Sequence, residues 1–179
     1  MANTDIATTE IVTPAANNEV GRGYNRQIVL TSADLVANEP SGSSDGDTQT
    51  YELFSLPVGS YLRGVYYYLR TAFDDSGGGS DLTVQLGDTS DPNGIMDVKQ
   101  VHVDGTEVFA AVNDGVFFNT TGTNNANTNV VNSKVYTTAN VVEALFTPGA
   151  GGTNYKLSEL TAGEIVFVAD IVYANQAQV

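Results

Sequence analysis

The sequence predicts an all-β protein that folds as a two-sheet β-sandwich, and three observations lead to this fold class. Residues 61–73 and 164–173 alternate in the manner of strands and carry apolar or aromatic side chains on both sides. Several other short segments alternate with one apolar side only, and no amphipathic helix of useful length interrupts them. A strand covered on both faces is central in a sheet that packs against a second sheet or a partner chain. A chain of 179 residues is long enough for one such domain.

Residues 1–24 are predicted to form an extended N-terminal arm, and residues 25–179 to form the sandwich. The arm is rich in Asn, Thr, Ala and acidic side chains, and therefore has too little apolar surface to fold by itself. Two interpretations stay open: a mobile tail, and an arm that becomes ordered on a neighbouring subunit. In the second interpretation its scattered apolar side chains make the contacts, namely Ile6, Ile11, Val12, Val20 and Tyr24.

The first predicted elements after the arm are a strand at residues 27–30, a single helical turn beginning at Ser32, and a strand at residues 50–56. The loop between them contains Gly42-Ser43-Ser44-Asp45-Gly46, which matches the Gly-x-Ser-x-Gly nucleophile elbow of hydrolases. That motif requires a strand before the serine and a helix after it, whereas here a strand-like segment follows. The interpretation as a hydrolase is therefore not favoured.

The central stretch is predicted to be a hairpin of residues 61–73 and 81–86, closed by an acidic, glycine-rich turn. In its first strand Leu62, Tyr66 and Tyr68 share one side, and Val65, Tyr67, Leu69 and Phe73 share the other. Residues 87–94 are expected to be a turn because Asp, Pro and Asn-Gly are concentrated there. Short strands are expected to follow at residues 98–103, 106–112 and 115–118.

Residues 119–140 are predicted to be a long surface excursion of the sandwich, because Asn and Thr dominate them and little can be buried. Their apolar side chains are Val130, Val131, Val135 and Tyr136. Long surface loops are where contacts with partners tend to lie. A strand at residues 141–146 and the final strand at residues 164–173 complete the chain's predicted elements.

The charge of the chain argues against nucleic acid and anionic membrane as partners. Seven basic residues against twenty-one acidic ones give a formal net charge of -14, which repels phosphate and anionic lipid. No stretch is long and apolar enough to span a bilayer, and the N-terminus lacks the features of a secretory signal, so we expect assembly in a cytoplasm. Without cysteine the chain has neither disulfides nor thiolate metal sites.

Carboxylates crowd the loops around the central hairpin: Asp74, Asp75, Asp81, Asp88, Asp91 and Asp97. Carboxylate oxygens on glycine-rich loops suit calcium, although the spacing is not that of an EF-hand and such residues usually cap turns. Calcium binding therefore stays an open alternative. A glycosidase is disfavoured because the chain has no Trp to form a sugar platform. The single histidine, His102, is interpreted as an exposed or hydrogen-bonded strand residue, and we predict no catalytic residue and no cofactor.

Several of these segments together resemble structural proteins of tailed-phage particles. The resemblance rests on residues 62–65 and 71–74, on the run LTVQLGDTSDPNG at residues 82–94 with its "GDxxDPxG"-like bend, and on LTAGEIVF at residues 160–167. In that family such segments belong to a jelly-roll-like sandwich. The resemblance implies a capsid cement or decoration protein, typically a trimer seated on the outer shell where capsomers meet.

The resulting hypothesis is a non-enzymatic virion protein that binds the outer capsid surface and cements neighbouring subunits. Its expected partners are the major capsid protein and two further copies of itself, with multivalent contacts that give lasting attachment. Besides the arm, the expected contact residues are Tyr66, Tyr67, Tyr68, Val130, Val131, Val135 and Tyr136. For the tyrosines, packing in the core is an equally good interpretation. The alternative function is a head-fibre or tail domain whose loops bind a host receptor or a glycan.

Overall fold

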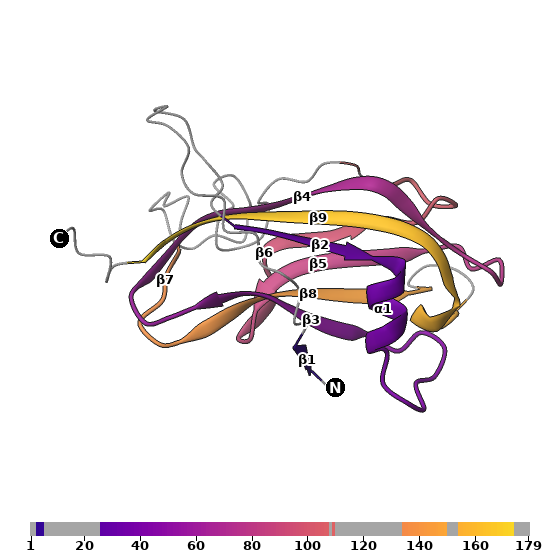
Figure 1. Ribbon diagram of the computed structural model, residues 1–179, viewed down its shortest axis with the longest axis horizontal. Helices are drawn as coiled ribbons and strands as arrows, with labels where there is room; N and C mark the ends of the chain where they lie inside the picture. The colour runs from indigo at the N-terminus through magenta and orange to yellow at the C-terminus, as the bar shows by residue number, and fades with distance from the viewer. Residues whose placement is uncertain (1–2, 6–25, 108, 110–133, 150–153, 174–179) are drawn as a thin grey trace, which may run out of the picture.

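The computed structural model describes residues 3–5, 26–107, 109, 134–149 and 154–173. These residues form two β-sheets packed face to face, one of five strands and one of four, so the predicted all-β sandwich is confirmed (Figure 1). The elements in chain order are β1 (Asn3–Asp5), β2 (Arg26–Thr31), α1 (Ser32–Asn38), β3 (Gln49–Leu56), β4 (Ser60–Asp75), β5 (Leu82–Asp88), β6 (Asp91–Gln100), β7 (Lys134–Val135), β8 (Asn140–Pro148), η1 (Leu157–Glu159) and β9 (Leu160–Tyr173).

The strand order is that of a jelly roll. One sheet runs β1-β3-β8-β5-β6 and the other β2-β9-β4-β7. The first half of the chain pairs with the second half in four antiparallel pairs, β2–β9, β3–β8, β4–β7 and β5–β6. Together they correspond to one long hairpin whose closing turn lies between β5 and β6. Rolling this hairpin up places β9 against β4 and β8 against β5. The eight strands β2 to β9 therefore have the wrapped double-sheet topology of a jelly roll.

The predicted central hairpin is wrong. Strand β4 belongs to the four-stranded sheet, whereas β5 belongs to the five-stranded one, so the glycine-rich segment between them crosses from one sheet to the other. Strand β4 pairs with β9 and β7 instead, and its position inside the sheet confirms that it is a central strand. Alternation grouped Val65, Tyr67, Leu69 and Phe73 correctly on the core side, but it wrongly placed Leu62 with Tyr66 and Tyr68. The register shifts between Leu62 and Gly64, so Leu62 also faces the core. Alternation also carries no information about which strand is the neighbour.

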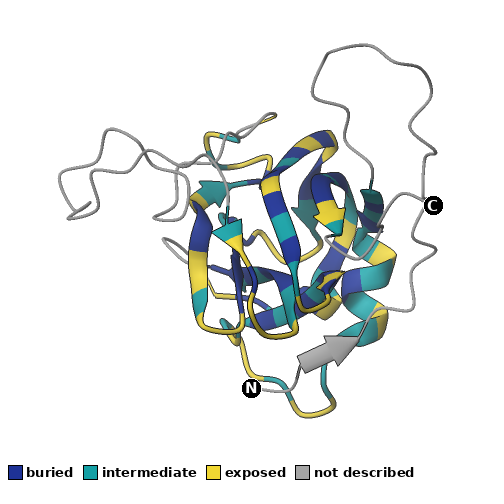
Figure 2. Cartoon of the chain, turned by 90° about the vertical axis from the view of Figure 1, so that its left-hand side faces the viewer, coloured by how far each residue is buried: buried dark blue, intermediate teal, exposed yellow. Residues whose placement is uncertain are grey.

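Aromatic rings join the two sheets through the core. Phe146 of β8 meets Phe73 of β4 at a centroid distance of 6.2 Å and Phe167 of β9 at 6.5 Å, both at steep interplanar angles. Tyr51 of β3 packs edge-on against Phe146 at 5.5 Å, and Tyr67 packs against Phe167 at 6.2 Å. Edge-to-face pairs of this kind stabilise a core beyond the area they bury. Figure 2 shows the resulting alternation of buried and exposed positions along the strands.

Helix α1 begins where a local signal predicts it, at Ser32, and continues to Asn38. Thr31 is its N-cap and forms a capping box with Asp34: the Thr31 hydroxyl oxygen accepts the Asp34 N–H, and the Asp34 carboxylate accepts the Thr31 N–H. After the helix, Glu39 accepts the N–H groups of Leu157 and Ser158 and so holds η1 beside α1. Neither helix in the described ranges has the length and apolar character needed to cross a bilayer.

The turn predicted at residues 87–94 is narrower in the structure, where β5 extends to Asp88 and β6 starts at Asp91. Gly87 is required beside the β5–β6 turn, since a Cβ atom on it would lie 1.9 Å from the backbone oxygen of Asp91. The expected strand at residues 98–103 ends at Gln100, and residues 104–107 contain no strand. The other strand predictions between residues 108 and 118 lie outside the described residues, apart from the single position Phe109.

The predicted arm lies largely outside the described residues as well. Its described part is β1, which pairs with β3 as the parallel neighbour of an otherwise antiparallel sheet. Of the excursion predicted at residues 119–140, the structure describes residues 134–140, which include strand β7.

Candidate functional site

The outward surface of the β2-β9-β4-β7 sheet gathers several of the residues that the sequence nominates for contact. The strand registers arrange this surface in rows, and we call it the β4–β9 face. One row joins Val135, Tyr61 and Val172 across β7, β4 and β9. Further along, Tyr66 lies opposite Val168 and Tyr68 opposite Val166. Cross-strand neighbours on one side of a sheet lie in contact, so the side chains of each row pack together, although Val166 itself is fully buried.

Two of the three nominated tyrosines lie on this face. Tyr68 is 39% exposed and Tyr66 is half-buried. The prediction that Tyr67 is an exposed contact residue is wrong, because its side chain is only 2% exposed and packs against Phe167 in the core. The alternation of the strand requires this arrangement, since adjacent side chains point to opposite faces.

Strand β7 brings a second nominated segment to the same face. Val135 is 58% exposed and pairs with Tyr61, whereas Tyr136 is 3% exposed, so its prediction as a contact residue is wrong. The remaining nominated residues lie outside the described residues: Ile6, Ile11, Val12, Val20, Tyr24, Val130 and Val131. The structure adds Val172, which is 41% exposed and which alternation alone would have placed on this side of the strand.

The charges on the β4–β9 face are paired. Arg63 donates to the buried carboxylate of Asp170 at 2.8 Å, and Arg70 lies 2.5 Å from Glu164. The Arg70 guanidinium also stands over the ring of Tyr68, 5.9 Å from its centroid. Within each pair the positive and negative charges cancel, although the whole chain has a net charge of -14. The face is therefore less repulsive toward another acidic surface than the average surface of this protein.

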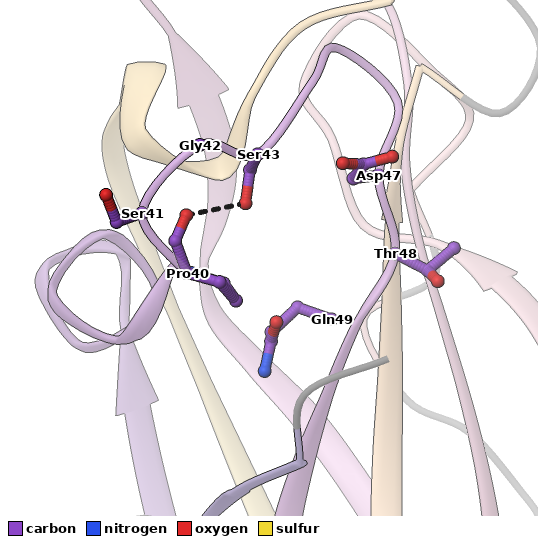
Figure 3. A pocket seen from close by; sticks show the side chains of 7 residues that line it. All are labelled: Pro40, Ser41, Gly42, Ser43, Asp47, Thr48 and Gln49. Carbon is purple, nitrogen blue, oxygen red and sulfur yellow. Dashed lines mark hydrogen bonds between the residues drawn. The ribbon is translucent and has the colours of Figure 1, made fainter.

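The Gly-x-Ser-x-Gly segment forms a polar pocket and not a nucleophile elbow (Figure 3). The pocket has a volume of about 310 Å³ and is lined by Pro40, Ser41, Gly42, Ser43, Asp47, Thr48 and Gln49. Within it the Ser43 hydroxyl donates to the carbonyl of Pro40 at 2.7 Å. Strand β3 follows the segment where the hydrolase motif needs a helix, which agrees with the sequence interpretation.

A buried ion pair closes one end of the sandwich, which we call the Asp88 end. The ammonium of Lys134 lies 2.6 Å from Oδ2 of Asp88, whose side chain is fully buried. Oδ1 accepts the hydroxyl and N–H of Ser90 and the N–H of Asp91. Burial by itself raises the pKa of Asp88, but Lys134 and Ser90 outweigh it and hold the pKa below its ordinary value. Lys134 also lies 5.0 Å from the ring centroid of Tyr136.

The opposite end, which we call the Asp75 end, is organised around His102. The ring is fully buried, its Nδ1 accepts the N–H of Asp104 at 3.2 Å, and its Nε2 lies 3.0 Å from Oδ2 of Asp75. Because Nδ1 accepts a hydrogen bond, the proton is on Nε2, which donates to the carboxylate. The interpretation of His102 as a hydrogen-bonded residue agrees with this, and its exposed variant does not.

Asp75 in turn fastens the glycine-rich segment that crosses between the sheets. Its Oδ1 accepts the N–H groups of Gly77 at 2.6 Å and Gly79 at 3.0 Å. Burial raises the pKa of Asp75, but the two backbone donors and His102 together lower it below the ordinary value. Sequence spacing gave no sign of this pair, because 27 positions separate Asp75 from His102.

Searches of the chain against protein-family models, curated proteins and solved structures found no match. The function is therefore argued from the surfaces and clusters described above.

Proposed function

We propose that this protein is a structural component of a tailed-phage particle that binds the outer capsid surface as a homotrimer and cements neighbouring capsid subunits. The observation that carries the proposal is the β4–β9 face, where exposed tyrosine and valine side chains alternate with neutralised arginine–carboxylate pairs. Tyr and Arg are the residue types enriched at the centres of protein interfaces, and Tyr68 beneath Arg70 provides both.

The electrostatics support docking at this face. A net charge of -14 makes most approaches between copies of the chain, or toward an acidic shell, unfavourable. At the β4–β9 face, Asp170 and Glu164 are already paired with arginines, so contact there does not bring uncompensated charges together. The jelly roll adds rigidity, since the exposed residues belong to strands that are fixed in the core through their other side.

The test is binding to intact tailed-phage heads that lack decoration, measured by co-sedimentation, together with the mass of the free protein in solution. We expect a fixed stoichiometry, a higher temperature of head rupture, and a species three times the 18.9 kDa of the chain. Tyr68→Asp is expected to abolish both binding and trimer formation because it replaces an exposed aromatic ring of the face with a charge.

Val98→Asp is the matched control, because Val98 is an exposed valine on β6 of the other sheet. It is expected to retain binding and trimer formation. A protein that stays monomeric at high concentration and leaves heads unaltered contradicts the proposal, as does a Val98→Asp variant that loses binding as fully as Tyr68→Asp.

A second candidate function is receptor or glycan binding by a head-fibre or tail domain, and the pocket at residues 40–49 favours it. Its hydroxyl, carboxylate and amide groups, from Ser41, Asp47, Thr48 and Gln49, suit the hydroxyls of a sugar. Binding to a glycan array that Asp47→Ala removes, with no binding to heads, would favour this function over cementing.

A further inference from the structure

Carboxylates accumulate at the Asp75 end, where the described residues provide no lysine or arginine partner. Carboxylate oxygens of Asp74 and Asp75 and a ring nitrogen of His102 all lie within 4.8 Å of one another. Glu159 is close by, since a Cβ atom built on Gly77 would lie 3.4 Å from its Oε2 and 3.5 Å from Oδ1 of Asp75. Among the described residues, neither Asp74, Asp75 nor Glu159 forms an ion pair with a lysine or arginine.

The buried hydroxyl of Tyr155 is an independent sign of a missing ligand. The side chain is 3% exposed, and its hydroxyl has no hydrogen-bond partner among the described residues. The ring packs against Gly79 beside Asp75: a Cβ atom on Gly79 would lie 2.4 Å from Tyr155 Cδ1 and 2.8 Å from Asp75 Oδ2. Buried hydroxyls almost always have a partner, so this one points to an oxygen that occupies the neighbouring space when the site is filled.

The electrostatic surroundings of Tyr155 are acidic. Burial raises the pKa of its hydroxyl, and Asp75, Asp81, Asp74 and Glu159 raise it further. The carboxylates that surround Tyr155 therefore come from three segments of the chain, and the ring itself lies against Gly79 beside Asp75. In the described part of the chain no lysine or arginine pairs with Asp74, Asp75 or Glu159, so a bound cation would meet carboxylates that no lysine or arginine has neutralised.

The donor set selects a hard cation. His102 is not free to be a ligand, because Nδ1 accepts the Asp104 N–H and Nε2 uses its proton on Asp75. It instead orients the Asp75 carboxylate, as second-layer partners of metal ligands commonly do. Asp74 keeps Oδ2 without a donor in the described part of the chain, since only its Oδ1 accepts an N–H, that of Asp75. Oxygen donors alone favour calcium over zinc.

We propose that the Asp75 end is a calcium site in which Asp74 and Asp75 are the ligands, with Asp81, Glu159 and the Tyr155 hydroxyl completing an oxygen-rich surrounding. The ion neutralises the carboxylates, and an oxygen that it carries accepts the hydrogen bond of Tyr155. This inference does not depend on the proposed function, because it concerns the opposite end of β4 from the Val135 row and uses none of the β4–β9 face residues.

The test is metal binding by the full chain, with terbium as a luminescent probe for calcium. The chain has no Trp, so tyrosine is the donor that sensitises terbium emission, and Tyr155 is placed beside the site. We expect emission that saturates at one ion per chain and is displaced by calcium chloride. Calcium is also expected to raise the melting temperature relative to a chelator. Tyr155→Phe should lose most of the sensitised emission while calcium still raises its melting temperature.

Asp74→Asn is expected to lower calcium affinity by more than about tenfold, since it removes a ligand charge. The matched control is Asp97→Asn, which removes an exposed carboxylate on β6 in the other sheet and should leave the affinity unchanged. Absence of saturable calcium binding by the unmodified chain overturns the proposal, and so does equal weakening by Asp74→Asn and Asp97→Asn. Unchanged terbium emission from Tyr155→Phe overturns the placement of the ion, even if Asp74→Asn does not fold.

Discussion

The two ends of the sandwich hold buried carboxylates in contrasting ways. At the Asp88 end, the chain supplies its own cation, because Lys134 lies 2.6 Å from the carboxylate and beside the ring of Tyr136. At the Asp75 end the corresponding partners are the neutral ring of His102 and two backbone N–H groups. Each end also buries a tyrosine, Tyr136 or Tyr155, whose hydroxyl has no partner among the described residues.

The difference teaches where the chain balances its own buried charge, because the unpartnered tyrosine hydroxyl is common to both ends. At the Asp88 end, Lys134 offsets the charge that burial would otherwise penalise. At the Asp75 end, hydrogen bonds keep Asp75 ionised, but they add no positive charge for Asp74, Asp81 and Glu159. The first end is expected to depend on residues of the chain alone, and the second on ions in the buffer.

The largest loss of stability is expected from replacing a glycine, and comparing one glycine at each end shows which end tolerates a side chain less. Gly87→Ala places a Cβ atom 1.9 Å from the backbone oxygen of Asp91. This oxygen cannot move without opening the β5–β6 turn, so we expect the free energy of unfolding to fall by more than about 3 kcal/mol, or the variant not to fold. Gly79→Ala meets the ring of Tyr155, a side chain that can shift, and should cost less. Chemical denaturation of both variants measures the order; a Gly79→Ala loss equal to that of Gly87→Ala would contradict it.

Removing the internal cation should have the next largest effect. Lys134→Met keeps the length of the side chain but leaves the buried Asp88 without its counter-charge, and we expect a loss of about 2 kcal/mol. The loss of stability should be smaller in the double variant Lys134→Met with Asp88→Asn, because it no longer contains an unpaired buried carboxylate. Urea denaturation at neutral pH, with and without calcium, checks this. The loss relative to the unmodified chain should be the same with and without calcium, because the ion acts at the other end and stabilises both proteins alike; a loss that disappears only in calcium would contradict this.

Acid should destabilise both ends. The pKa values of Asp75 and Asp88 lie below their ordinary value of 3.8, so each carboxylate adds stability that is present above that value and is lost as the pH falls through the lower folded pKa. Melting temperatures measured downward from pH 5 should therefore fall most steeply below pH 3.8. Asp88→Asn should make the melting temperature depend less on pH in this range. If its melting temperature falls as steeply as that of the unmodified chain, Asp88 does not contribute to the acid sensitivity.

The smallest effect is expected on the β4–β9 face. Arg70→Ala breaks an ion pair with Glu164 in which both side chains are partly exposed, and such pairs contribute little to stability. We therefore expect no measurable change in melting temperature and a clear loss of binding to heads. A marked fall in melting temperature would show that the pair is part of the fold's stability and not of the docking surface.

Local features of this fold could be predicted from the sequence, whereas long-range pairing could not. The start of α1 follows from Thr31 and Asp34, which form a cap within one turn of chain. The sides of β4 from Val65 to Leu69 follow from alternation, whereas Leu62 was assigned to the wrong side because a shift in register before Gly64 cannot be read from the pattern. The neighbour of β4 is β9, about a hundred positions later, and no residue pattern in either strand specifies that choice.

The candidate sites divide in the same way. Tyr68 and Val135 were found from exposed apolar chemistry, but Tyr67 and Tyr136 have the same side chains and lie in the core. Tyrosine fits both environments, so its identity does not decide between them. The abundance of Asp in the loops around β4 and β5 suggested calcium, yet the proximity of Tyr155 required the fold, since β5, β6, β7 and β8 lie between these residues in the chain.

The strand connectivity of the jelly roll has a consequence for folding during synthesis. Strand β9 is the last described strand to be synthesised, yet it lies between β2 and β4 and supplies Phe167 to the middle of the core. While the ribosome still holds this strand, β2 and β4 have no shared neighbour, and their bare edges are open to pairing with other chains. The protein can therefore complete its fold only after the final strand has left the exit tunnel, so a stall just before Leu160 is expected to produce aggregation instead of a smaller stable domain.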